Sequence, residues 1–176
     1  MILPYLNEES VYAQYRFDEP WNGPNNRLLA EEIRVEQFQC PSGPERGRPY
    51  NTNYVAVVGE ATIFPGSGTA KLSDISDGQE NTILITEIGN SNIHWMEPRD
   101  LVFESLRFLP HPRESSPTAI SSHHPAGPGV AFVNHGYDRL RKSLSDSTLQ
   151  SLFTIAGGES IGREDLERSS GSHLAE

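Results

Sequence analysis

The sequence predicts an α+β fold in which N-terminal helices are followed by a small antiparallel sheet with long loops. Helical spacing of apolar residues is found mainly in the first 35 residues, and β-branched runs come after it. Helical and strand-like patterns do not alternate along the chain, as they would in a parallel α/β sheet. The 15 glycines and 13 prolines also favour many turns over a helical bundle.

Length and composition predict one domain with a modest core. A chain of 176 residues fits a single compact unit, and its 35% hydrophobic content and mean hydropathy of −0.52 indicate a small interior. We therefore expect one domain over residues 1–160. Residues 161–176 are mostly charged or small, which is typical of a disordered tail.

Two helices are expected before the sheet. The first lies within residues 5–17 and ends before Pro20, since apolar residues recur there at loosely helical spacing. The second runs over residues 25–35 and has an apolar face. Asn25 or Asn26 is a suitable N-cap, because its side-chain oxygen can accept a hydrogen bond from a free backbone N–H.

Four strand segments are expected after these helices. Residues 54–58 are rich in β-branched side chains and end at a glycine, which indicates a buried strand. Residues 82–88 form the best strand pattern of the chain. Residues 129–133 and 137–141 flank a short turn and predict a hairpin, in which Gly136 is free to adopt a positive φ.

A short amphipathic helix is expected around Leu149, close to the end of the domain. Ser145 or Asp146 would cap its start, and the glycine pair that begins at Gly157 would end it. The stretch 110–128, which precedes the hairpin, is rich in proline, serine and histidine. We expect this stretch to be irregular and exposed.

The charge balance excludes nucleic acid as a partner. The formal net charge is −10, from 24 acidic and 14 basic residues, and such a surface repels phosphate backbones. The single cysteine, Cys40, permits neither an intrachain disulfide nor a thiolate zinc site. No apolar run approaches the roughly 20 residues that cross a bilayer, so we expect no membrane insertion by this chain itself. As written, without a signal peptide, the chain is expected in the cytoplasm.

The acidic turn formed by residues 74–81 is the strongest candidate for a metal site. Oxygen ligands at alternating positions around a glycine suit a hard cation such as Ca²⁺. The spacing of an EF-hand is absent, and Asp or Asn side chains also stabilise turns by bonding to nearby backbone N–H groups, which is the favoured interpretation. The candidate ligands are Asp74, Asp77, Glu80 and Asn81.

Two tryptophans lie in proline-braced loops and are candidates for recognition. Such loops could bind a peptide, a glycan or a neighbouring subunit. They could equally act as plugs that close the small core from each end, which is the favoured interpretation. Glu97, with Arg99 or Asp100, is expected to set the shape of its loop through ion pairing and backbone hydrogen bonds. The binding-loop candidates are Trp21, Trp95, Glu97, Arg99, Asp100 and His124.

No enzymatic constellation is evident. A hydrolase needs a nucleophile, a base and an orienting group, but the sequence has no Gly-x-Ser-x-Gly elbow. Cys40 precedes Pro41, which is typical of a turn and not of a catalytic helix start. The adjacent His123 and His124 would point apart in an extended loop, which disfavours a shared metal ion. We expect no enzymatic activity and no cofactor beyond the candidate Ca²⁺.

Eight short blocks occur in the order and spacing of one known family. The blocks are ILPYL (2–6), DEPWNGPNN (18–26), FQCPS (38–42), TNYVAVVG (52–59), DISDGQENTI (74–83), WMEPRDL (95–101), SHHP (122–125) and LFTIAGGE (152–159). On these blocks, the chain resembles the planctomycete proteins of the domain of unknown function 1559, from residue 2 to about residue 160.

The resemblance implies a pseudopilin-like head, with an antiparallel sheet against an N-terminal helix and no established catalytic activity. Fuller members begin with a prepilin-type leader and a membrane helix, whereas Met1 is expected to start inside the head. With that helix, the head would lie at the cell envelope. The family's C-terminal motif is His, nine residues and Asp-Gly, but here nine residues separate His124 from Asn134-His135.

The implied role is assembly or recognition at the cell envelope, with protein partners or self-assembly. The alternative is a calcium- or saccharide-binding module. A hydrolase is the least favoured function.

Overall fold

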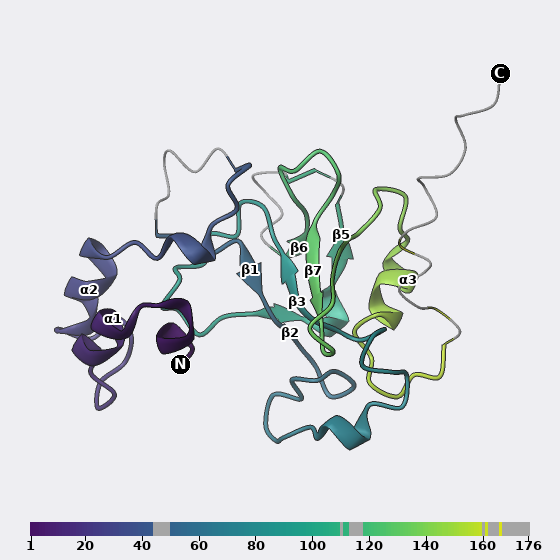
Figure 1. Cartoon of the computed structure of the whole chain (residues 1–176), viewed down its shortest axis with the longest axis horizontal. Coiled ribbons are helices and arrows are strands. Elements are labelled where there is room, and N and C mark those ends of the chain that lie inside the picture. Colours follow the sequence, from purple (N-terminus) through teal and green to yellow (C-terminus); the bar gives the residue numbers. More distant parts are fainter. Residues whose placement is uncertain (44–49, 110, 113–117, 160, 162–165, 167–176) are drawn as a thin grey trace.

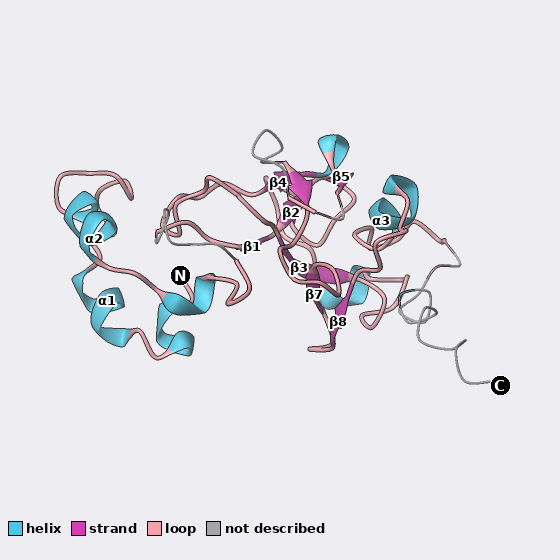
Figure 2. Ribbon diagram, turned by 90° about the horizontal axis from the view of Figure 1, so that it is seen from above, coloured by secondary structure: helices cyan, strands magenta, loops and turns pink. Residues whose placement is uncertain are grey.

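The computed structural model describes residues 1–43, 50–109, 111–112, 118–159, 161 and 166. It has an α+β fold, as predicted, with a helical N-terminal lobe beside a body built around a small sheet (Figure 1). Seen from above, the lobe lies at one end of an elongated molecule, and the sheet and the last helix occupy the other end (Figure 2). Much of the chain between these elements is loop, which agrees with its glycine and proline content.

The N-terminal lobe contains shorter helices than the sequence predicts. They are the 3-10 helix η1 (Leu3–Leu6), α1 (Glu9–Gln14), α2 (Asn26–Glu32) and the 3-10 helix η2 (Glu36–Phe38). The predicted first helix is interrupted because Asn7 adopts left-handed backbone angles, with φ at 61°. It also ends early, since Tyr15 is extended, well before Pro20.

A buried asparagine organises this lobe. Asn26 is fully buried, and its Oδ1 accepts a hydrogen bond from the Arg16 N–H at 2.8 Å. Its Nδ2 donates to the carbonyls of Arg16 at 2.8 Å and Pro20 at 3.1 Å. The predicted cap on α2 is wrong, because neither asparagine side chain caps the helix. Instead, the Glu19 carboxylate accepts the N–H groups of Asn25 and Asn26, and these bonds lower the Glu19 pKa.

The central sheet is antiparallel with the strand order β1-β3-β7-β8. Its strands are β1 (Tyr54–Val55), β3 (Ile83–Glu87), β7 (Gly129–Phe132) and β8 (Tyr137–Arg139). The predicted strand over residues 82–88 therefore lies inside the sheet, between β1 and β7. The predicted hairpin is confirmed, but its turn differs: His135 takes the positive φ of 68° in place of Gly136.

The predicted strand over residues 54–58 is divided between two sheets. β1 pairs with β3, whereas β2 (Val57–Val58) pairs in parallel with β4 (Leu101–Val102). The division falls at Ala56, whose N–H donates to the Asp100 carboxylate at 2.9 Å. The Asp100 carboxylate thus accepts the N–H that a continuous strand would donate to a neighbouring strand. At Ala56 the chain therefore changes its partner strand from β3 to β4.

A second parallel pair corrects the prediction for residues 110–128. β5 (Arg107–Phe108) pairs with β6 (Ala119–Ile120), so this stretch contains a strand. Ile120 is fully buried, as are the two serines that follow it. The stretch is therefore neither wholly irregular nor exposed, because its apolar residues complete the core of the body. Residues 110 and 113–117 lie outside the described residues.

The last helix, α3 (Asp146–Ser151), forms where the sequence predicts it. Ser145 is the cap, since its hydroxyl accepts a hydrogen bond from the Thr148 N–H at 3.1 Å. Of the predicted tail, residues 162–165 and 167–176 lie outside the described residues. Leu166 is buried within the main core, so at least this part of the expected tail packs on the body.

The described part of the chain contains two apolar clusters. The larger one fills the body between the sheet and α3, and it includes the fully buried Phe132 and Phe153. The smaller one holds the N-terminal lobe together around Leu3, Val11 and Val35, with further hydrophobic residues packed against it. Among the described residues, no helix is both long enough and apolar enough to cross a membrane.

Candidate functional site

An apolar groove of about 550 Å³ opens on the N-terminal lobe. Its walls contain four aromatic side chains, Tyr15, Trp21, Phe38 and Trp95, together with the acidic side chain of Glu97. The two tryptophan loops, which are 74 positions apart in sequence, thus meet at one site. The expectation that they close the core from opposite ends is wrong, because both tryptophans line the same groove.

Stacked rings fix the shape of this groove. The His94 imidazole stacks on Trp21, with ring centres 5.2 Å apart, and on Tyr50 at 6.1 Å. Trp95 stacks on Phe38 at 6.0 Å. Each tryptophan therefore stacks on another ring, which restrains its orientation.

The indole N–H groups of the two tryptophans differ in their bonding. The Trp95 Nε1 donates to the Ile33 carbonyl at 3.0 Å, which ties the 95–98 loop to the lobe. For the Trp21 indole N–H, the described residues supply no acceptor. Trp21 is half-buried and lines the groove, so its N–H is a donor available to a ligand.

His94 is held as the neutral tautomer. Its Nε2 lies 3.1 Å from the Ala30 carbonyl and must donate to it, while its Nδ1 accepts the Met96 N–H at 3.1 Å. Burial among the rings lowers the His94 pKa, since the charged imidazolium would lose its hydration, and the contacts with Ala30 and Glu97 only partly oppose this effect. A proton on Nδ1 would also remove the acceptor of the Met96 N–H.

The charged residues of the second tryptophan loop bind neighbouring loops and one another. Glu97 and Arg99 form the expected ion pair, with 2.7 Å between Oε1 and Nε. The Arg99 Nη2 also donates to the Asn92 carbonyl at 2.6 Å. Asp100 points away from this pair to the N–H of Ala56, so Asp100 lies outside the groove.

The acidic turn uses one carboxylate to bind the C-terminal loop. Asp77 Oδ2 accepts the Gly157 N–H at 2.7 Å, and Oδ1 accepts the Gly158 N–H at 3.0 Å. The Asn81 side-chain amide donates to the Asp77 carbonyl at 2.9 Å. The glycine pair thus follows α3 without capping it, and its N–H groups bind this aspartate.

The other acidic residues of the turn face elsewhere. Asp74 Oδ2 accepts the Lys71 N–H at 2.8 Å and closes a short 3-10 helix, η4 (Leu72–Asp74). Glu80 is exposed. Within the ranges that the structure describes, no group of three or more His, Cys, Asp or Glu side chains is placed to hold a metal ion.

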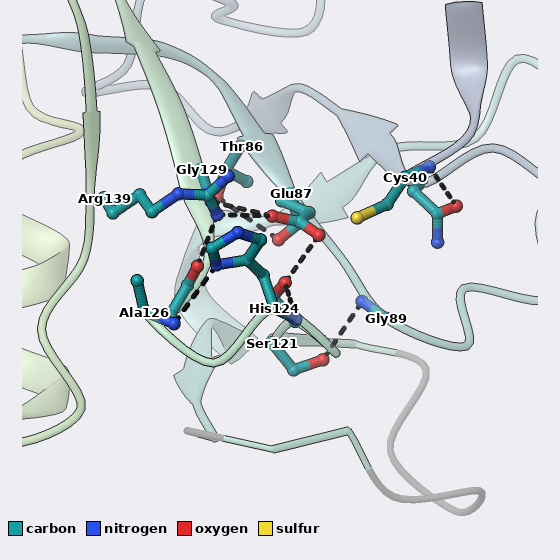
Figure 3. Close-up of polar contacts among 12 residues, drawn as sticks. Cys40, Thr86, Glu87, Gly89, Ser121, His124, Ala126, Gly129 and Arg139 are labelled. Atoms are coloured by element: carbon teal, nitrogen blue, oxygen red, sulfur yellow. Dashed lines mark hydrogen bonds and ion pairs between the residues drawn. The ribbon is translucent and has the colours of Figure 1, made fainter. Parts of the chain in front are cut away.

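A buried carboxylate at the end of β3 was not singled out by the sequence. Glu87 is only 2% exposed, and its Oε1 accepts the Ser122 hydroxyl hydrogen (Figure 3). Its Oε2 accepts the Gly129 N–H at 2.8 Å and lies 3.6 Å from the Arg139 guanidinium. Arg139 also donates to the Gly127 carbonyl at 2.8 Å. An ionisable residue inside an otherwise apolar strand was the sequence feature that could have indicated this network.

Cys40 lies beside this network and is chemically protected. The thiol is buried, and burial together with a hydrogen bond to Glu87 raises the Cys40 pKa to about 11 (Figure 3). A thiol with such a pKa stays protonated near neutral pH and is a poor nucleophile.

The two adjacent histidines have different partners, as expected. The Nδ1 of His124 accepts the Ala126 N–H at 3.1 Å, and the backbone N–H of His124 donates to Ser122. The His123 ring lies 3.3 Å from the Asn90 amide oxygen. His124 therefore belongs to the loop beside Glu87 and lies outside the groove between the tryptophans.

The chain matches a known protein family over most of its length. The model of a family described as "Protein of unknown function (DUF1559)" matches residues 1–113, which include the N-terminal lobe and both tryptophan loops. No curated protein and no solved structure matches the chain.

We expect Glu87→Ala to lower the free energy of unfolding by about 3–5 kcal/mol, because it leaves buried polar partners without their shared acceptor. Urea unfolding followed by tryptophan fluorescence measures this loss. Glu104→Ala is the control, since that carboxylate is exposed and has no hydrogen bond within the described ranges. It should change stability by less than about 0.5 kcal/mol. Equal losses at both positions would contradict the role of Glu87.

His94 should make stability depend on pH near neutrality. Its folded pKa lies below the ordinary 6.5, so the unfolded chain binds more protons between these two values. The stabilisation is present above about pH 6.5 and is lost as pH falls towards the folded pKa. Urea unfolding from about pH 7.5 to about pH 5.5 should show a smaller decline for His94→Phe than for the natural protein. His111→Gln, at an exposed histidine, should retain the natural decline; a reduced decline there would argue against His94.

Proposed function

The chain belongs to the DUF1559 family of proteins of unknown function, and on this basis we propose that it is a non-catalytic, pseudopilin-like head domain. Its role would be assembly or recognition at the cell envelope, where the N-terminal lobe contacts another protein. The envelope location follows from the family resemblance of the sequence blocks. The protein contact is supported by the surface of the lobe.

Exposed apolar side chains on the lobe are the observation that carries this proposal. Large hydrophobic residues with high exposure gather in the first 28 residues of the chain, whereas few lie elsewhere among the described residues. Those on the lobe are Met1, Ile2, Tyr5, Tyr12, Phe17 and Leu28. Exposed apolar side chains that are concentrated in one lobe of a folded protein are typical of an interaction site.

The absence of catalysis is supported by the geometry of the nucleophiles. Cys40 is buried with a raised pKa, as described above. The Ser122 hydroxyl donates to the Glu87 carboxylate. No hydrogen bond joins a serine hydroxyl or a cysteine thiol to a histidine ring in the part of the chain that the structure describes. A hydrolase would need such a pair, or a comparable base, at its nucleophile.

For the acidic turn, we propose a structural role in place of calcium binding. Both Asp77 oxygens already accept backbone N–H groups from the loop after α3. A cation would have to compete with these donors for the same oxygens. The turn then serves to fasten the C-terminal loop to the body.

Site-specific photocrosslinking tests the protein contact. Benzoylphenylalanine placed at Tyr5 or Leu28 should give protein adducts in the envelope fraction of the native cells. The matched controls are Leu72 and Val102, whose exposures of 59% and 53% resemble the 54% of Leu28. The controls should give no adduct. Adducts of equal yield at all four positions, or none at Tyr5 and Leu28, would refute the proposed contact surface.

Calcium addition tests the acidic turn. We expect Asp77→Ala to lower stability by about 1.5–3 kcal/mol, because two hydrogen bonds to a charged group are lost. The melting temperature of the natural protein should be the same in millimolar calcium as in chelator. A rise with calcium that Asp77→Ala abolishes would instead establish a cation site. Glu80→Ala is the matched control within the turn and should leave the melting temperature unchanged.

A further inference from the structure

We propose that the groove between Trp21 and Trp95 binds an extended, proline-rich peptide segment that carries basic side chains. This inference rests on the proposed function, since the groove opens on the lobe that we propose contacts another protein. It adds the chemistry of the partner segment, which neither the family description nor the proposed function specifies.

The walls of the groove suit a polyproline II helix. Two indoles and the Tyr15 ring line it, and Pro20 and Pro98 stand beside the tryptophans. Proline-rich segments dock in aromatic-lined grooves, because their rings fit between flat side chains and their backbone is already ordered. The groove is also ordered before binding, because Trp21 stacks on His94. Little conformational entropy is then lost when such a peptide binds.

The hydrogen-bonding capacity of the groove points to the same ligand. A polyproline II backbone has no internal hydrogen bonds and, where it is rich in proline, presents carbonyl acceptors with few N–H donors. A suitable site therefore supplies donors. The Trp21 indole N–H has no acceptor among the described residues, whereas the Trp95 N–H is already bound to Ile33. Trp21 is therefore the donor that we assign to a ligand carbonyl.

Charge favours a basic segment. Glu97 places a carboxylate in the wall of the groove, although it is paired with Arg99. Residues 1–36 contain seven acidic and three basic side chains, and the whole chain carries a net charge of −10. Lysine or arginine residues between the prolines would be attracted to Glu97 and to the net negative charge of the chain, and acidic residues there would be repelled.

A saccharide fits the groove less well. Saccharide binding combines an exposed aromatic face with several polar side chains that converge on the hydroxyl groups. Here, the groove has mainly apolar walls, and among the residues that the structure describes, Glu97 is the acidic side chain that lines it. Trp21 and Trp95 each have one face covered by another ring. A peptide that needs one donor and apolar walls matches these features better.

Peptide titration tests the inference. The probe is a fluorescein-labelled peptide of about nine residues made of Pro-Pro-Arg repeats, added to the 176-residue chain. Fluorescence polarisation should show saturable binding. A peptide of Gly-Ser-Arg repeats has the same charge without proline, and a peptide of Pro-Pro-Glu repeats has the proline without the positive charge. Both should bind at least about tenfold more weakly.

Point variants locate the binding. Trp21→Phe keeps a ring over His94 but removes the N–H, so the dissociation constant should rise about three- to tenfold. Glu97→Gln should raise it about two- to fivefold and reduce the preference for the Arg peptide over the Glu peptide. Leu72→Ser, at an exposed apolar residue outside the groove, should leave binding unchanged. Circular dichroism and the melting temperature of each variant show whether it folds.

The possible outcomes separate this inference from the proposed function. The peptide inference would be overturned if the Pro-Pro-Arg and Gly-Ser-Arg peptides bound equally well. It would also be overturned if a folded Trp21→Phe variant bound the Pro-Pro-Arg peptide with an unchanged dissociation constant. Saturable binding of an oligosaccharide such as a hexasaccharide of N-acetylglucosamine, in place of the peptide, would also overturn it. If the peptide inference failed but crosslinks still formed at Tyr5 and Leu28, the proposed contact surface would stand on its own. Peptide binding without any crosslink would support the groove and refute that surface.

Discussion

The buried carboxylate of Glu87 is the constraint on which the rest of the fold depends. Taking a charge out of water is costly, so the chain must bring donors to it from other segments. The donors come from the segment after β6, from the first residue of β7 and from the last residue of β8. Three segments that follow β3 in sequence thus converge on one end of that strand, and this convergence sets the register of the hairpin.

A second set of buried hydrogen bonds extends from this point towards the N-terminal lobe. Ile88, next to Glu87, accepts the Asn53 side-chain amide at 3.0 Å, and the Asn53 Oδ1 accepts the Cys40 N–H at 2.9 Å. The Asn53 N–H donates to the Phe38 carbonyl at 2.7 Å. Phe38 in turn stacks on Trp95 in the groove. The position of the groove is therefore determined by the sheet, through a short series of backbone and amide contacts.

The polar side chains of this protein mainly organise its backbone. Asn26, Asp77 and Asp100 each bind N–H or carbonyl groups of another loop, in a chain where regular secondary structure satisfies only part of the backbone. This use of side chains explains why short helices and two-residue strands suffice. It also leaves the rings of the N-terminal lobe as the surface best suited to recognition, since their apolar faces remain partly exposed.

The sequence by itself determined the class of the fold, a strand within residues 82–88, the hairpin and the last helix, because these follow from local periodicity; the structure decided that Ser145, and not Asp146, caps that helix. It also indicated that Glu97 acts with Arg99 or Asp100 within its own loop, and the structure selects Arg99. Only the tertiary structure decided that strand 54–58 divides, that Glu19 caps α2 and that the two tryptophans share one groove. Each of these features depends on a contact between residues whose positions in the sequence follow no helical or strand periodicity. A hydrogen bond from the Ala56 N–H to the Asp100 carboxylate, or a histidine ring between Trp21 and Tyr50, has no periodic signature, since it arises from packing in three dimensions.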